Sequence, residues 1–160
     1  MDVNQASIEF SEELVESFLI TLKELHQKVI GSTVICSIEF PETDNQLESA
    51  ITSVMVGYFN EMKYPTFIEQ VAALTIFVAK DHAFSDGNKR TAQQIPPMMF
   101  TLWLDDFKDI QCEDEEMYEL IEGIARGEIN QKEFTKWLIN HIVFNNSNHT
   151  NSCHATAKKI

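Results

Sequence analysis

The chain has few basic residues, and this shortage argues against one large class of function. Its 160 residues include 12 lysines and arginines against 25 aspartates and glutamates, which gives a formal net charge of −13. A protein with this balance repels the phosphate backbone of nucleic acids. We therefore expect partners other than DNA or RNA.

Cysteine is also scarce, and the sequence has no long apolar run. Cys36, Cys112 and Cys153 are odd in number and far apart, which argues against a disulfide framework or a zinc ribbon and suits the reducing cytoplasm. The longest apolar stretch, residues 95–104, is much shorter than a membrane span, and the first ten residues lack a basic region followed by an apolar one. We expect a cytoplasmic protein without a membrane segment or an export signal.

The remaining composition is typical of one globular domain. Hydrophobic residues make up 44% of the chain and charged residues 23%, and the length fits a domain of about 100–200 residues. Residues 145–160 are rich in Asn, Ser and Thr and contain few large apolar side chains. The sequence therefore predicts a folded domain over residues 1–144 and a disordered polar tail over residues 145–160.

Apolar residues recur at helical spacing along most of the domain, and this predicts an all-α core. Residues 71–79 are apolar on every side, which is typical of a central helix surrounded by other helices. Side chains that cap helix N-termini mark several expected helix starts. They are Ser11, Asp44, Thr66 with Glu69, and Asn130 with Glu133.

Two segments depart from this pattern. Residues 33–40 alternate apolar with smaller or polar side chains, which predicts a short extended ribbon outside the core. Pro96 and Pro97 lack a backbone N–H, and each costs about 3 kcal/mol inside a helix. We expect the helix that begins near Asn88 to be interrupted there and a second segment to start at Pro97.

One loop concentrates residues with chemical potential. Residues 82–92 read HAFSDGNKRTA and follow the predicted buried helix directly. Free N–H groups at a helix N-terminus attract anions, and a glycine allows a turn that directs successive amides at one point. The loop supplies a histidine, an aromatic side chain, a carboxylate, a glycine and then the start of a helix with two cations. These are His82, Phe84, Asp86, Gly87, Asn88, Lys89 and Arg90.

The combination indicates phosphoryl or nucleotidyl transfer. A polyphosphate that approaches this acidic chain needs fixed cations and a metal ion, and one carboxylate such as Asp86 is enough to bind Mg²⁺ together with phosphate oxygens and water. A neutral His82 can take the proton of an attacking hydroxyl. Each residue alone has a structural interpretation, such as a helix-end histidine or an ordinary Asp-Gly turn. The order of the residues favours a functional interpretation of the whole loop.

This loop resembles the signature of the Fic/Doc (Fido) family, HxFx[DE]GN[GK]R, and is closest to the Doc, or death on curing, toxin branch. The order of predicted helices from residue 10 to residue 142 and the GEIN turn at residues 127–130 are also similar. The resemblance implies an all-α, Fic/Doc-like helical bundle around a buried central helix, with a short β-ribbon flap. It also implies a protein-modifying transferase that uses ATP with Mg²⁺.

Residue roles follow from the resemblance. It implies that His82 is the catalytic base toward a hydroxyl of a target protein, that Asp86 binds the Mg²⁺ of ATP and that Phe84 anchors the loop in the core. The anion hole would consist of Gly87, Asn88 and Lys89, with Arg90 also at the phosphates. The flap that aligns the target segment would consist of Thr33, Val34, Ile35, Cys36, Ser37 and Ile38.

Departures from the Fic pattern favour the Doc activity. Fic enzymes that transfer AMP usually have glycine at the position of Lys89 and a second arginine at the position of Gln93. The resemblance therefore implies a kinase toxin whose target is a translation elongation factor. Protein AMP transfer is the alternative, and a non-catalytic nucleotide- or protein-binding module with a bent helix at Pro96 is a second one. Because the chain lacks the inhibitory pattern [ST]xxxE[GN], we expect a separate antitoxin or inhibitory helix as partner.

Overall fold

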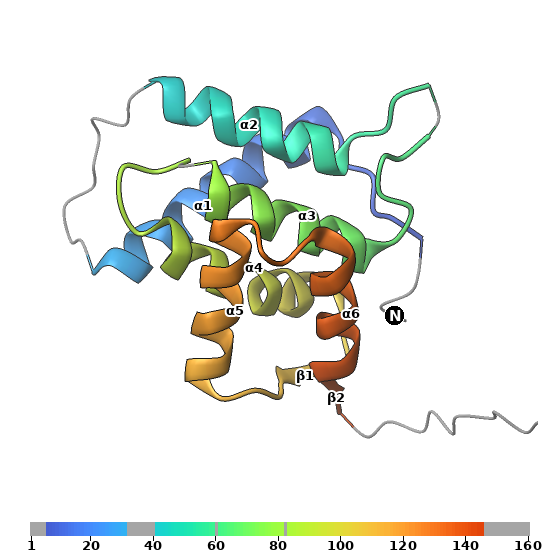
Figure 1. Cartoon of the computed structure of the whole chain (residues 1–160). Coiled ribbons are helices and arrows are strands. Elements are labelled where there is room, and N and C mark those ends of the chain that lie inside the picture. The colour runs from blue at the N-terminus through green and yellow to red at the C-terminus, as the bar shows by residue number, and fades with distance from the viewer. Residues whose placement is uncertain (1–5, 32–40, 60, 82, 146–160) are drawn as a thin grey trace, which may run out of the picture.

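The computed structural model describes residues 6–31, 41–59, 61–81 and 83–145, although not the side chains of residues 41–44. These residues form six helices and one two-stranded sheet (Figure 1). The all-α class is thus confirmed, and the two-stranded sheet is formed by residues other than the predicted ribbon over residues 33–40. In chain order the elements are α1 (Glu12–Ile30), α2 (Pro41–Met55), α3 (Phe67–Lys80), α4 (Asn88–Trp103), β1 (Phe107–Ile110), α5 (Asp114–Arg126), α6 (Gln131–His141) and β2 (Ile142–Phe144).

Helix α3 is the buried centre that the sequence predicts. It packs against α2, α4, α5 and α6 (Figure 1), and Val71, Ala72, Leu74 and Val78 are fully buried. A helix that is apolar on every side is stable in this position because four other helices cover most of its surface. The C-terminal end of α3 leads directly into the loop that carries the motif.

Most of the expected helix caps are present. The Ser11 hydroxyl accepts a hydrogen bond from the Leu14 N–H at 3.3 Å, and Gly31 ends α1 in the left-handed conformation. Reciprocal capping boxes open two further helices. They join Thr66 to Glu69 at α3 and Asn130 to Glu133 at α6.

The expected break at the two prolines is wrong. Helix α4 is continuous and contains both Pro96 and Pro97. The prolines remove only two N–H donors from the helix, whereas one face of α4 is buried against α3. Burial of this apolar face outweighs the two missing hydrogen bonds. The buried residues include Ile95, Pro96, Met99 and Phe100.

Two smaller expectations also need correction. Helix α2 begins at Pro41, so Asp44 lies inside the helix and does not cap it. Proline suits a first helical position because its missing N–H would have no intrahelical acceptor there. At the other end of the domain, the predicted order of helices up to residue 142 stops one residue earlier: α6 ends at His141, and Ile142 caps α6 and starts β2. Strands β1 and β2 pair in antiparallel fashion, with Phe107 opposite Phe144 and Ile110 opposite Ile142.

Some sequence predictions concern residues outside the described ones. The ribbon expected over residues 33–40 and the tail over residues 146–160 lie there, so the flap and the domain boundary at residue 144 stay predictions. Within the described ranges, none of the helices combines the length and the apolar character that crossing a bilayer requires.

Candidate functional site

The loop between α3 and α4 is anchored by Phe84. This side chain is 6% exposed, and its ring stacks on the imidazole of His26 in α1, with ring centroids 3.8 Å apart and planes 5° from parallel. The same imidazole lies 3.0 Å from the hydroxyl of the buried Thr91, measured from Nδ1 to Oγ1. Helices α1 and α4 therefore hold the loop from both sides.

Asn88 closes the loop into a short ring of backbone. Its Oδ1 accepts a hydrogen bond from the Phe84 N–H at 2.8 Å, and its Nδ2 donates one to the Phe84 carbonyl at 2.7 Å. The amide side chain is thus committed to the loop itself. The backbone N–H of Asn88 is left for a ligand.

Gly87 meets a conformational demand and a steric one. Its φ of 75° lies in the left-handed region, which glycine adopts without strain. A Cβ at this position would lie 2.7 Å from Ile30 Cγ2 and 3.3 Å from His26 Cε1. The loop can approach α1 this closely only because residue 87 has no side chain.

The first turn of α4 presents free backbone donors. The Thr91 N–H makes the first intrahelical bond, to the Gly87 carbonyl at 2.9 Å, and glycine offers no side chain as a cap. No group in the described part of the chain accepts a hydrogen bond from the N–H groups of Asn88, Lys89 or Arg90. Together with the helix dipole, these donors form a site suited to an anion.

Charged side chains surround these donors. Lys89 Nζ lies 2.8 Å from Glu122 Oε1 in α5, and Arg126 lies 3.6 Å from the other oxygen of Glu122. The hydrogen bond from Lys89 lowers the pKa of Glu122, and a second hydrogen bond from Tyr118 acts in the same direction. Glu122 is therefore ionised at neutral pH. In the absence of a ligand it forms the ion pair with Lys89.

Asp86 has the properties that a magnesium ligand at this site needs. Its side chain is 84% exposed. One of its oxygens accepts the Gly87 N–H at 2.6 Å, and the other lies 3.5 Å from Arg90. No group of three or more potential ligand side chains occurs among the described residues. A single carboxylate nevertheless fits Mg²⁺, because this ion is commonly bound by one or two carboxylates with phosphate oxygens and water.

A hollow adjoins the charged side chains along α5. It measures about 630 Å³ and is lined by residues of α5 and of the connection that follows it. Glu122 forms part of this lining, so the hollow begins beside Lys89. Its lining also includes the half-exposed ring of Tyr118 and the guanidinium of Arg126.

Comparison with known proteins gives a match, and the matched residues include this loop. A family model described as the Fic/DOC family matches residues 19–95, which include the later part of α1, all of α2 and α3, and the first half of α4. This match supports the Fic/DOC family. Curated proteins and solved structures give no match to the chain. A Fic/DOC assignment indicates protein modification with a nucleotide donor, and members of this family generally use ATP with Mg²⁺.

The structure brings together most, but not all, of the predicted Fic/DOC site residues. Phe84, Asp86 and residues 87–90 form one continuous loop and helix start. His82 and the flap residues 33–38 lie outside the described residues, so their roles stay predictions. The motif alone did not reveal two contributors from other parts of the fold: His26, which lies beside Phe84 and Thr91, and Glu122, which pairs with Lys89. Their spacing from the loop follows no local pattern, so a single sequence carries no signal for them.

Proposed function

We propose that this chain transfers the terminal phosphate of ATP, bound with Mg²⁺, to a serine or threonine hydroxyl of a target protein. The observation that carries the proposal is the open N-terminus of α4, where free N–H groups of residues 88–90 lie next to Lys89, Arg90 and Asp86. This arrangement suits a polyphosphate with one bound metal ion. The match to the Fic/DOC family supports the same reaction class.

The proposed reaction is a direct displacement at phosphorus. The target hydroxyl oxygen forms a bond to the terminal phosphorus, the bond between that phosphorus and the bridging oxygen of ADP breaks, and His82 takes the hydroxyl proton. The products are a phosphoprotein and ADP. Mg²⁺ held by Asp86 would neutralise phosphate charge, while the α4 amides and Lys89 position the transferred group.

The nucleoside has space along α5. The hollow lined by Tyr118, Glu122 and Arg126 begins beside Lys89. A triphosphate at the start of α4 would leave its nucleoside next to this surface. Lys89 must exchange Glu122 for phosphate when the nucleotide binds, so the ion pair in the free protein keeps the lysine at the site.

The choice of phosphate transfer over AMP transfer rests on two residues. Lys89 and Gln93 stand where AMP-transferring Fic enzymes usually have glycine and arginine. The non-catalytic alternative relied on a bent helix, and α4 is continuous at Pro96. We further propose a cytoplasmic toxin with a translation elongation factor as target and an antitoxin or inhibitory helix as partner.

Labelled ATP tests the proposal directly. The purified chain is incubated with a cell extract and with ATP that carries the label on the terminal phosphate or on the α-phosphate. We expect transfer of the terminal label, and loss of this transfer in His82→Ala with ATP binding retained. The matched control is His141→Ala, which changes a histidine stacked on Trp137 in α6. Transfer of the α-label would instead establish AMP transfer, and full transfer by His82→Ala would refute the role of the histidine.

A further inference from the structure

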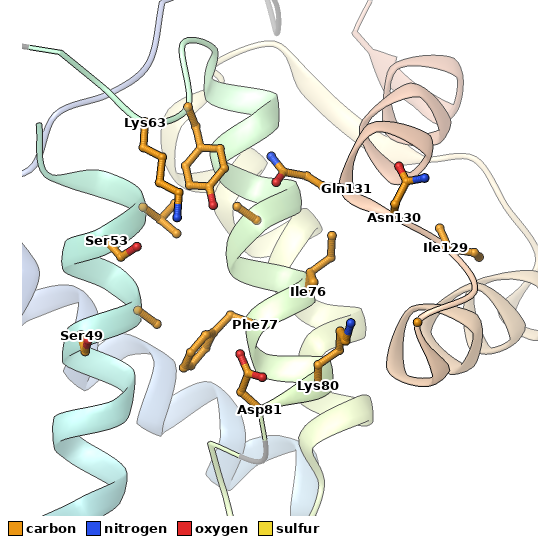
Figure 2. Close-up of a pocket in the computed structure, with 15 residues that line it drawn as sticks. Ser49, Ser53, Lys63, Ile76, Phe77, Lys80, Asp81, Ile129, Asn130 and Gln131 are labelled. Atoms are coloured by element: carbon orange, nitrogen blue, oxygen red, sulfur yellow. The ribbon is translucent and has the colours of Figure 1, made fainter.

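A groove lies over part of α3, where Ile76 and Phe77 are only partly buried. It measures about 470 Å³ and runs between α2 on one side and the connection from α5 to α6 on the other (Figure 2). One end is at Asp81, the residue directly before His82. The other end is at Lys63, before α3 begins (Figure 2).

The floor of the groove is apolar and its edges are polar. Ile76 and Phe77 project from α3 between the two walls (Figure 2), and both are only partly buried although they pack against the core. Ser53 from α2 and Gln131 from α6 lie on opposite edges (Figure 2). Pockets with an apolar floor and a few polar groups at the rim are typical of binding sites, and this volume lies in the range of ligand pockets.

The charge of the groove is opposite to that of the whole protein. Its lining includes two lysines, Lys63 and Lys80, and one acidic residue, Asp81, whereas the chain carries a net charge of −13. Neither lysine forms an ion pair with any described residue. Lys63 Nζ instead lies 5.3 Å from the centre of the Tyr64 ring. Two cations that have no acidic partner among the described residues, beside an apolar floor, leave a recognition site that an acidic group would complete.

We propose that this groove binds an acidic segment of a partner protein, with one large apolar side chain of that segment on Ile76 and Phe77. Its carboxylates would pair with Lys63 and Lys80. Burial of the apolar side chain on Ile76 and Phe77 supplies affinity. The charges of Lys63 and Lys80 select the sequence and the direction of the bound segment. This interaction does not depend on nucleotide transfer.

Two other occupants have the wrong charge. The C-terminal residues 146–160 contain no acidic residue and two lysines, so they would place like charges against Lys63 and Lys80. A second copy of this chain brings another net charge of −13, which opposes self-association. An acidic segment of a different protein is the occupant that the lysines favour.

A pair of synthetic peptides tests the proposal. One fluorescein-labelled peptide alternates glutamate with leucine and phenylalanine, and the other has lysine in place of each glutamate. We expect the full chain to bind the acidic peptide and not the basic one by fluorescence anisotropy. We also expect the double variant Lys63→Glu, Lys80→Glu to weaken binding by about tenfold or more, the factor that corresponds to 1.4 kcal/mol.

The matched control changes the same number of charges elsewhere. Lys108 in β1 and Lys136 in α6 are exposed and do not line the groove, so Lys108→Glu, Lys136→Glu should leave binding unchanged. The dependence of binding on salt is a second criterion. If the groove lysines attract the acidic peptide, its affinity falls as the ionic strength rises. If repulsion between the peptide and the net negative charge of the chain dominates, its affinity rises with ionic strength.

Several results would overturn the proposal. It fails if the basic peptide binds as well as the acidic one, if both double variants lose binding equally, or if affinity increases with salt. It also fails if the wild-type chain binds neither peptide, or if sedimentation shows dimers that dissociate in the Lys63→Glu, Lys80→Glu variant. Circular dichroism melting of both variants shows that any loss of binding occurs in folded protein.

Discussion

Replacement of Gly87 by alanine separates two physical demands on the loop. The residue has a φ of 75°, and an added Cβ would lie 2.7 Å from Ile30 Cγ2. Gly31, at the end of α1, offers a matched control because its φ is 67° and nothing lies within 4 Å of an added Cβ. Both variants introduce backbone strain, but only Gly87→Ala also introduces a steric overlap.

The expected magnitudes follow from these two terms. A left-handed conformation costs a non-glycine residue about 1–2 kcal/mol. An overlap in a packed region typically adds about 1–3 kcal/mol. We therefore expect Gly31→Ala to lower the free energy of unfolding by about 1–2 kcal/mol and Gly87→Ala by about 2–5 kcal/mol. For a chain of this size, the latter corresponds to a decrease in Tm of roughly 4–20 °C.

Urea unfolding followed by circular dichroism measures both losses under the same conditions. The difference between the two variants reports the contact of residue 87 with α1, because loss of unfolded-state entropy is common to both alanines. Equal destabilisation would show that Ile30 and His26 move aside without cost. A Gly87→Ala variant as stable as the wild type would refute the described loop conformation itself.

Two further predictions concern the polar groups of the site. Asn88→Ala removes both hydrogen bonds to the Phe84 backbone, so thermal melting should show a loss of about 1–3 kcal/mol, together with faster hydrogen exchange of the Phe84 amide; unchanged exchange would contradict the loop closure. The pKa of Glu122 is lowered, chiefly by the hydrogen bond from Lys89, so its stabilising effect is present above the unfolded-state pKa and is lost as the pH falls through the folded-state pKa. Carbon-13 NMR titration should therefore find a Glu122 midpoint below that of an ordinary glutamate, and Lys89→Met should raise it; the same midpoint in both proteins would exclude the ion pair in solution.

Local chemistry explains which parts of the fold the sequence could predict. A cap joins residues three positions apart, so Thr66 with Glu69 and Asn130 with Glu133 mark their helices without any tertiary knowledge. The central position of α3 follows from its uniformly apolar composition. The expected break at the prolines of α4 is wrong because the local penalty for proline takes no account of tertiary packing, and Pro96 is buried in the domain.

The candidate site shows the same division between local and long-range information. Phe84, Gly87 and Asn88 lie within five consecutive positions of the chain, and their spacing alone predicts a turn that presents amides to an anion. The partners that fix this turn come from distant segments: His26 precedes Thr91 by 65 residues, and Glu122 follows Lys89 by 33. Their meeting depends on how α1 and α5 pack against α4, which no local rule determines. The motif therefore indicates a phosphate site, and the packed helices add the counter-ion on Lys89 that an incoming phosphate must replace.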